Sequence, residues 1–370
     1  MEDTLTIQRT VNGVAFSYPI VWKDDFSELA DEIRAIDGIA PHKICVVTDS
    51  NVGPLYLDEV TDALSDLSNT ELYTWTFAAG EQNKNLNTVT ALIRFLIENR
   101  FDRSDMLAAL GGGVTGDLTG FAASIYLRGI DFFQIPTSLL AQVDSSVGGK
   151  TGVDFDEYKN MVGAFHQPRL VYMNASVLRT LPADQFASGM GEVLKSAEIR
   201  SEYFFRRIER KADRILARDP DVLSYVIRSC CEIKGAVVED DPEDRGLRAI
   251  LNFGHTLGHA IEKDCGFRLL HGQCVAIGSV GAAWLSMERG MIPESVYHRI
   301  LALNRIFDLP VSVSGLTAEQ IVETARSDKK VENGRLKFIL LDGLGNAVID
   351  RNVTDAELLA AARVLTGESA

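Results

Sequence analysis

Three of the chain's six histidines, His255, His259 and His271, fall within one short stretch. His255 and His259 are four residues apart, so on a helix they share one face. Two neutral imidazoles, the carboxylate of Glu192 and an open position would form a catalytic Zn²⁺-type site. A single histidine is usually a buried polar contact, but three so close together favour a divalent metal. Thr256 stands where H-E-x-x-H requires glutamate, which excludes the zinc-protease pattern.

A glycine-rich segment could bind the phosphates of a dinucleotide. Gly111, Gly113 and Gly116 have the dinucleotide spacing, after an apolar strand-like run and at the start of a helical pattern. Glycine lets the backbone approach a phosphate, and a helix N-terminus favours its negative charge. A tight strand-to-helix turn also needs glycine, so this motif alone leaves both interpretations open.

Two other expected strand ends carry polar residues. Asp49 and Asn51 could contact a ribose, but their spacing favours a helix N-cap. The segment from Gly80 to Lys84, which includes Glu81, is equally ambiguous. Ligands of open α/β sheets bind at the carboxyl ends of the strands, where all of these residues are expected.

A second glycine pair, at 148–149, directly precedes Lys150 and a threonine. This is not the phosphate loop of ATPases, because Asp144 stands where G-x-x-x-x-G-K-[ST] requires its first glycine. ATP hydrolysis is therefore not supported. Lys150, with Lys159 and Asn160 nearby, still suits an anionic ligand.

Four cations stand among apolar or small residues: Arg128, Lys195, Lys234 and Arg248. Surface cations are usually solvated and need no explanation. Arg248 is different, because on a continuous helix it would lie one turn before Asn252 and two turns before His255. Cations so close to a metal site indicate an anionic substrate.

The elements that must position these groups follow from the hydrophobic pattern. Residues 4–11 and 15–22 indicate a hairpin that turns at Asn12-Gly13. Strand-like runs then alternate with amphipathic helical segments: strands at Ile44–Thr48, Leu72–Phe77, Met106–Leu110 and Phe132–Ile135, and helices at Tyr56–Leu67, Leu86–Asn99 and Leu118–Tyr126. This alternation predicts a Rossmann-like parallel sheet with helices on both faces.

Beyond Leu181, helical periodicity dominates. Long helices are expected at Tyr203–Ala217, Val222–Val238 and Ala249–Cys265, and the next strong strand only at Leu336–Leu341. We therefore expect two domains, an α/β domain over residues 1–180 and a mainly α-helical domain over residues 181–370.

The composition limits the possible partners. With 370 residues, 46% of them hydrophobic, the chain can form two cores. The net charge of −15 argues against a general affinity for nucleic acid or anionic membranes. The five cysteines include no CxxC pair, so reduced and buried thiols are expected. The sequence has neither a secretory signal pattern nor an apolar run of the ~20 residues needed to cross a bilayer, so we expect a cytoplasmic protein.

Taken together, the motifs resemble one family. Five segments are similar, in this order, to the signature of the 3-dehydroquinate synthases, which are sugar-phosphate cyclases: GGGVTGD (111–117), YLRG (126–129), QVDSSVGGKT (142–151), KNMVGAF (159–165) and NFGHTLGH (252–259). The resemblance runs from about Val46 to the Asp328-Lys329-Lys330 segment. It implies a dehydroquinate synthase-like fold, with an NAD-binding α/β domain and a mainly helical domain for metal and substrate.

The resemblance also implies roles for particular residues. Glu192, His255 and His271 match the ligands of a divalent metal, zinc or cobalt. Positions that match NAD-binding residues are Asp49, Asn51, Glu81, Lys84, Gly113, Val114, Asp117, Thr137, Ser138, Lys150, Lys159 and Thr180. Positions that match residues acting on the substrate are Asp144, Lys150, Asn160, Lys195, Lys234, Arg248, Asn252 and His259. Arg128 matches an arginine that reaches the phosphate from a neighbouring subunit, which implies a homodimer. One of Lys329 and Lys330 is expected to contact substrate.

The implied reaction converts 3-deoxy-arabino-heptulosonate 7-phosphate to 3-dehydroquinate and phosphate, in the shikimate pathway to chorismate and the aromatic amino acids. It combines transient oxidation by NAD, phosphate elimination, re-reduction and an intramolecular aldol closure. Two alternatives remain open: another sugar-phosphate cyclase, of the amino-dehydroquinate or valiolone type, and an NAD- and metal-dependent polyol dehydrogenase. Arg248 and Lys234 favour a carboxylated substrate, since a neutral one would leave both cations without a partner charge.

Overall fold

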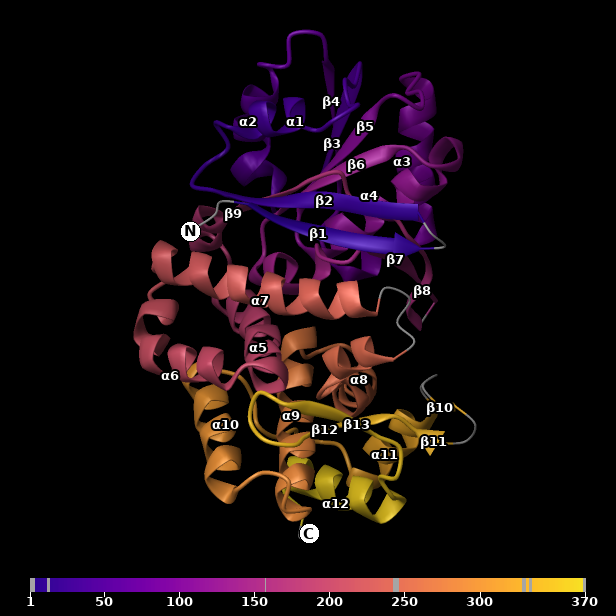
Figure 1. The fold of residues 1–370 in the computed structure, drawn as a ribbon. Coiled ribbons are helices and arrows are strands. Elements are labelled where there is room, and N and C mark those ends of the chain that lie inside the picture. The colour runs from indigo at the N-terminus through magenta and orange to yellow at the C-terminus, as the bar shows by residue number, and fades with distance from the viewer. Residues whose placement is uncertain are drawn as a thin grey trace. The chain divides into compact units, whose positions relative to one another are not determined.

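The chain forms two compact units, Met1–Leu181 and Pro182–Ala370 (Figure 1). The structure is a computed structural model that describes residues 4–11, 14–156, 158–241, 246–327, 331–332 and 335–368. Asn12-Gly13 and the Lys329-Lys330 pair therefore lie outside the described residues.

The first unit is built on a seven-stranded sheet in the order β1-β2-β9-β6-β5-β3-β4. All neighbours pair in parallel except β1 and β2, which form the predicted antiparallel hairpin. The strand bounds are β1 Thr4–Val11, β2 Val14–Lys23, β3 Lys43–Asp49, β4 Glu71–Phe77, β5 Met106–Gly111, β6 Asp131–Pro136 and β9 Val171–Asn174.

The central strands are buried on both faces, which explains their continuous apolar runs. Successive side chains point to opposite faces of a strand. On β3, Ile44 and Val46 join one apolar core with helices α1 (Leu29–Arg34) and α2 (Gly53–Leu64). Cys45 and Val47 join a second core with α3 (Leu86–Glu98) and α4 (Gly113–Ile125). The prediction of a parallel sheet with helices on both faces is confirmed.

Several short elements of this unit have no strong periodicity in the sequence. A π-helical turn (Ala141–Ser145) leads into a two-stranded hairpin of β7 (Lys150–Phe155) and β8 (Tyr158–Phe165). Single 3-10 turns cover η1 (Glu81–Asn83), η2 (Tyr126–Arg128) and η4 (Ala175–Arg179). These connections carry many of the polar residues singled out above.

The second unit is mainly helical, as predicted. Its helices are α5 Ala183–Arg200, α6 Glu202–Leu216, α7 Pro220–Asp240, α8 His255–Asp264, α9 His271–Glu288, α10 Glu294–Ile306, α11 Ala318–Ser327 and α12 Asp355–Thr366, with a 3-10 turn η5 at Leu247–Asn252. Two small hairpins pair β10 (Val331–Glu332) with β11 (Arg335–Leu336) and β12 (Phe338–Leu341) with β13 (Ala347–Asp350). Helix α9, buried along most of its length, contacts α5, α8, α10 and α12.

The predicted continuous helix over Ala249–Cys265 was wrong. Gly254 has φ = 77°, a left-handed conformation that a helix cannot continue through, so η5 ends at Asn252 and α8 begins at His255. Arg248 therefore does not share a helix flank with His255.

The five cysteines are free and buried, as expected. None of the helices in the described part of the chain combines the length and the hydropathy needed to span a bilayer.

Candidate active site

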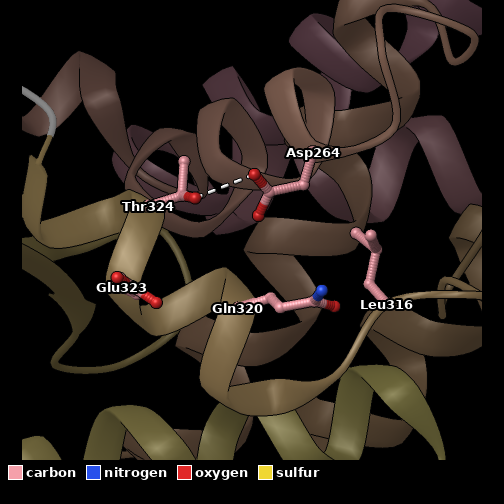
Figure 2. A pocket seen from close by; sticks show the side chains of 5 residues that line it. All are labelled: Asp264, Leu316, Gln320, Glu323 and Thr324. Carbon is pink, nitrogen blue, oxygen red and sulfur yellow. Dashed lines mark hydrogen bonds between the residues drawn. The ribbon is translucent and has the colours of Figure 1, made fainter.

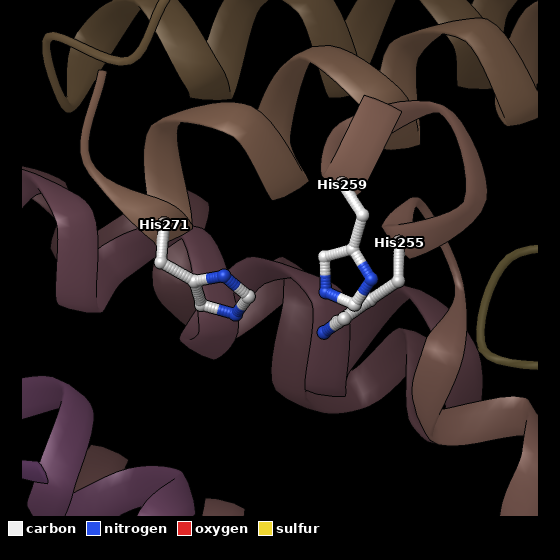
Figure 3. A group of neighbouring side chains, drawn as sticks. All are labelled: His255, His259 and His271. Carbon is white, nitrogen blue, oxygen red and sulfur yellow. The ribbon is translucent and has the colours of Figure 1, made fainter. Parts of the chain in front are cut away.

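The three clustered histidines lie together in the helical unit, with their rings turned toward one another (Figure 3). His255 and His259 come from the first turns of α8, and His271 is the first residue of α9. One nitrogen of each ring lies within 4.8 Å of the others. The i, i+4 spacing therefore places both α8 histidines on the side of the helix that faces His271.

The carboxylate of Glu192, on α5, completes this cluster. Its Oε1 lies 3.5 Å from Nε2 of His255 and 3.3 Å from Nε2 of His271. The other ring nitrogens have acceptors of their own: Nδ1 of His255 is 3.0 Å from the carbonyl of Phe253, and Nδ1 of His271 is 3.3 Å from Oε2 of Glu262. Nε2 of each ring therefore points toward Glu192, so that a divalent metal between them could take both nitrogens and the carboxylate as ligands.

The charges around Glu192 keep its carboxylate ionised. Burial alone opposes ionisation, but Lys195, whose Nζ lies 2.8 Å from Oε2, and the two imidazoles outweigh it, so the pKa of Glu192 lies well below its usual range. Burial lowers the pKa of His255, so its ring is neutral at pH 7. Burial also disfavours charge on His271, but the carboxylates of Glu192 and Glu262 raise its pKa to about 10. A divalent cation bound here would displace the proton from His271.

Small residues let the three helices of this site approach closely. A Cβ added to Gly258 would come 2.7 Å from the carbonyl of Cys274, so glycine permits the contact between α8 and α9. The N–H of Gly272 donates to Oγ of Ser188 at 3.0 Å, which joins the start of α9 to α5. Gly258 therefore lets α9 come close to α8 beside the histidines.

Buried cations lie on elements that contact one another beside this cluster. Arg248, on η5, is 2% exposed and Lys234, on α7, is 9% exposed. Nζ of Lys195 also donates to the carbonyl of Leu251 at 3.1 Å, which ties α5 to η5. The backbone N–H of Arg248 donates to Asp241 at 2.9 Å. Lysine and arginine form charge-assisted hydrogen bonds with anions, so these three side chains are suited to hold anionic groups of a ligand.

Asn252 and His259 are the two other residues of this unit that were expected to act on the substrate. Asn252 is the last residue of η5, and its Nδ2 donates to the carbonyl of Ala249 at 3.2 Å. The ring centroid of His259 lies 5.1 Å from that of His255 and 5.7 Å from that of His271. The helical unit thus carries these predicted metal and substrate residues on elements that contact one another, while the Lys329-Lys330 pair lies outside the described residues.

In the α/β unit, the residues expected to bind NAD follow neighbouring parallel strands. They are Asp49 and Asn51 at β3, Glu81 and Lys84 after β4, Gly113, Val114 and Asp117 after β5, and Thr137 and Ser138 after β6. The carboxyl ends of these strands share one edge of the sheet, where α/β folds bind their ligands.

Lys84 is the centre of a polar network at this edge. Its Nζ, almost fully buried, lies 2.6 Å from Oδ2 of Asp117 and 2.6 Å from Oδ1 of Asn160. Burial lowers the pKa of Lys84, but Asp117 and Glu81 raise it by more, so the ammonium stays charged. Nearby, Nζ of Lys159 lies 3.6 Å from Oε1 of Glu81. The structure therefore joins four residues expected to bind NAD with Asn160, which was expected to bind substrate.

Asp49 has a structural task as well. Its Oδ1 accepts from the backbone N–H groups of Asn51 (2.8 Å) and Val52 (3.1 Å), and its Oδ2 accepts from Thr115 (3.2 Å). The side chain thus stabilises the turn that leads into α2. The predicted N-cap role was wrong, because the N-cap of α2 is Val52, without a side-chain hydrogen bond. The glycine motif likewise serves a tight turn, because a Cβ on Gly111 would come 2.4 Å from Oγ1 of Thr115.

Four further predicted residues belong to the α/β unit. Thr180 forms a hydrogen bond with the hydroxyl of Tyr56. Asp144 lies half-buried in the π-helical turn, and Lys150 and Arg128 are exposed. Arg128 has φ = 71°, a conformation that costs energy for a residue with a Cβ.

A separate pocket of about 170 Å³ lies between the end of α8 and α11 (Figure 2). It is lined by Asp264, Leu316, Gln320, Glu323 and Thr324, and Thr324 donates to Asp264 at 2.8 Å. None of the predicted site residues lines it, and His255 lies at the opposite end of α8.

Sequence reasoning missed two buried carboxyls of the helical unit. Glu262 contacts His271, and its position three residues after His259 would have placed it on the same face of α8. Glu198, three residues after Lys195 on α5, is buried, and burial raises its pKa to about 8. Its apolar surroundings had no signal in the local sequence.

Comparison with known proteins places these features in a family. A profile described as the 3-dehydroquinate synthase N-terminal part matches residues 74–188, and one described as the C-terminal part matches residues 189–331. The 3-dehydroquinate synthase of Ruminiclostridium cellulolyticum is 43% identical over 95% of this chain and 97% of its own length. That of Shewanella piezotolerans is 46% identical over 92% and 95%, respectively.

Solved structures share the fold over nearly the whole chain. A 2-epi-5-epi-valiolone synthase from Streptomyces hygroscopicus subsp. jinggangensis, with NAD⁺ and Zn²⁺ bound, is 27% identical with a TM-score of 0.88, and the match covers 96% of this chain and 99% of that one. A 2-deoxy-scyllo-inosose synthase with carbaglucose-6-phosphate, NAD⁺ and Co²⁺ is 25% identical with a TM-score of 0.85, covering 97% and 99%. An NADH-dependent butanol dehydrogenase from Thermotoga maritima, at 14% identity and a TM-score of 0.64 over 94% and 96%, shares the fold alone.

The fold and the site therefore define a dehydroquinate synthase-like sugar-phosphate cyclase. Within that class, the two profiles and the relatives at more than 40% identity are decisive. The chain belongs to the 3-dehydroquinate synthase family of enzymes.

Proposed function

We propose that this enzyme converts 3-deoxy-arabino-heptulosonate 7-phosphate to 3-dehydroquinate and phosphate, as a homodimer in the shikimate pathway. The proposal is supported by the names of its relatives, by the NAD⁺ and Zn²⁺ or Co²⁺ bound in its structural neighbours, and by the site itself. The observation that carries it is the set of buried cations, Lys195, Lys234 and Arg248, on elements beside a histidine and carboxylate cluster.

Different residues of the chain are assigned to the metal, to the carboxylate end of the substrate and to its phosphate end. Glu192, His255 and His271 hold the metal. Lys234 and Arg248 bind the carboxylate, because buried cations give it charge-assisted hydrogen bonds. His259 relays a proton beside the metal.

Four residues are assigned to the phosphate end of the substrate. Lys150, Asn160 and Asn252 bind the phosphate, joined by an Arg128 from the neighbouring subunit, while Asp144 orients the ring hydroxyls. Lys195 keeps Glu192 ionised and contacts substrate.

The residues at the sheet edge of the α/β unit bind the dinucleotide. When bound, NAD supplies a reversible hydride acceptor and zinc or cobalt supplies Lewis acidity at a substrate hydroxyl. Lys84 and Asp117 are suited to hydroxyl groups of the cofactor, since both are charged and held in place by one another. The glycine turn before α4 lets a phosphate approach the helix N-terminus.

The nearest alternative is a cyclase of neutral sugar phosphates, since two of the three solved neighbours above are named as a 2-epi-5-epi-valiolone synthase and a 2-deoxy-scyllo-inosose synthase. Two observations favour the carboxylated substrate. Sequence identity is higher to the 3-dehydroquinate synthases, and Arg248 and Lys234 are buried cations suited to bind a carboxylate. A polyol dehydrogenase is supported only by the shared fold.

The test is an assay with purified protein, a divalent metal, catalytic NAD and 3-deoxy-arabino-heptulosonate 7-phosphate, following released phosphate and nicotinamide absorbance together. We expect metal-dependent phosphate release over many turnovers per NAD without net NADH, and dehydroquinate by mass spectrometry. If phosphate is released only from a heptulose phosphate without a carboxyl group, the enzyme is a cyclase of neutral sugar phosphates instead. NADH formed mole for mole with an oxidised polyol would establish the dehydrogenase.

A further inference from the structure

We infer that Glu262 is a positioning residue of the metal centre: its carboxylate holds the ring of His271 so that Nε2 faces the cation. The inference rests on the proposed metal binding. Glu262 lies on α8, one turn beyond His259, and its side chain is 4% exposed. Its Oε2 lies 3.3 Å from Nδ1 of His271.

The ring of His271 lies between two carboxylates, one at each nitrogen. Glu192 is 3.3 Å from Nε2 and Glu262 is 3.3 Å from Nδ1. Since an ionised carboxylate only accepts hydrogen bonds, both ring nitrogens carry a proton while no metal is bound. When a cation displaces the proton at Nε2, Glu262 still accepts from the proton at Nδ1, so Nε2 becomes the ligand atom. A carboxylate behind a ligating imidazole also makes the ligand nitrogen more basic.

The other histidine ligand is held differently, which makes the role of Glu262 specific. Nδ1 of His255 is 3.0 Å from the carbonyl of Phe253, a backbone group whose position is fixed by the turn before α8. His271 is the first residue of α9 and its side chain is 32% exposed, so it has less packing to fix its rotamer. The Glu262 side chain supplies that restraint from the adjacent helix.

The test compares Glu262→Gln and Glu262→Ala in the full-length, metal-free enzyme. Gln keeps an oxygen that can accept from Nδ1 but removes the charge, whereas Ala removes both. Asp264→Asn is the matched control, because Asp264 is also on α8 and accepts a hydrogen bond, but from Thr324. Thermal unfolding checks that each variant folds. Co²⁺ titration followed by visible absorption, and Zn²⁺ affinity by chelator competition, report on the site.

We expect Glu262→Ala to weaken metal affinity by roughly ten- to a hundred-fold and to change the Co²⁺ spectrum, with Gln between Ala and wild type. Asp264→Asn should bind metal as wild type does. If both Glu262 variants fold, bind Zn²⁺ with wild-type affinity and give the wild-type Co²⁺ spectrum, Glu262 does not position His271. If the wild-type protein itself binds no stoichiometric metal, the proposed metal site and this inference fail together.

Discussion

Nζ of Lys195 lies 2.8 Å from Oε2 of Glu192, three residues earlier on α5, and both side chains are at most 2% exposed. Such a pair is costly to desolvate and is stabilised only by close geometry. Here the pair lies beside His255 and His271. Lys195 therefore keeps Glu192 ionised next to the two imidazoles that would bind a metal together with it.

Replacing Lys195 by Met should destabilise the metal-free protein by about 3–5 kcal/mol, because it leaves a buried carboxylate without its nearest cation. Urea unfolding measures the change. Added Zn²⁺ should recover part of the loss, since the metal replaces the missing positive charge. Lys211→Met, at an exposed position of α6, is the control. A loss no larger than that of the control would contradict the role of the pair.

The metal ligands can be distinguished from the third histidine. Glu192→Gln, His255→Ala and His271→Ala should each weaken metal binding by more than about a hundred-fold, because each removes one of three protein ligands. His259→Ala should keep one equivalent of metal and lose turnover instead. Metal content after dialysis and steady-state kinetics separate the two outcomes. Metal loss in His259→Ala with retention in Glu192→Gln would mean that the ligands are the three histidines.

Arg248→Ala should lower kcat/KM for the carboxylated substrate. The loss of transition-state stabilisation should be about 2–4 kcal/mol, the scale of a broken buried charge pair. The physical reason is the burial of Arg248, which leaves the carboxylate no water to replace the lost contact. Arg210→Ala, exposed on α6, should have wild-type kinetics. An Arg248→Ala enzyme indistinguishable from wild type would remove this residue from the substrate site.

How far the sequence could predict these features depended on the range of the interactions. Ile44–Thr48 was recognised as a strand because burial on both faces leaves a local apolar run, and the strand extends over Lys43–Asp49. The pair His255 and His259 was recognised because helix periodicity is local. The β7–β8 hairpin, in contrast, lies in glycine-rich sequence without clear alternation.

Other features depend on packing between distant segments. The break at Gly254 could not be predicted from periodicity, which continues across it, because it depends on a backbone conformation and on the nearby α9. The contact between Glu262 and His271 requires the start of α9 to lie beside α8. Such contacts depend on tertiary structure, so local sequence patterns can predict which residues belong to a site but not which residues they contact.

If Arg128 completes the site of a neighbouring subunit, two inactive variants should complement each other. Arg128→Ala and Lys234→Ala each disable every site of their own homodimer. In a heterodimer, one site has intact Lys234 and receives an intact Arg128, while the other has lost both. After unfolding and refolding a 1:1 mixture, half the dimers are mixed, so about a quarter of wild-type turnover should return. No recovery in a mixture shown by mass spectrometry to contain heterodimers would place Arg128 in its own subunit's site or outside it.

Glu198 predicts a specific pH dependence of stability. Among the described residues, neither of its carboxylate oxygens has a hydrogen-bond partner, and burial raises its pKa to about 8 despite the nearby Lys195. The unfolded chain loses this proton near the ordinary value of about 4.5. Between these two values the folded state binds more protons, so stability is full below about pH 4.5 and is lost progressively as the pH rises to about 8.

Glu198→Gln should remove that loss, because the amide does not ionise. The variant should match the wild type near pH 4 and exceed its unfolding free energy by roughly 5 kcal/mol at pH 9. Urea unfolding across this pH range measures the difference, with the fluorescence of Trp284 reporting on the helical unit in a background that carries Trp22→Phe and Trp75→Phe. Glu232→Gln, exposed on α7, should leave the pH profile unchanged. Parallel profiles for wild type and Glu198→Gln would mean that the buried carboxyl stays ionised, compensated by a charge such as that of Lys195.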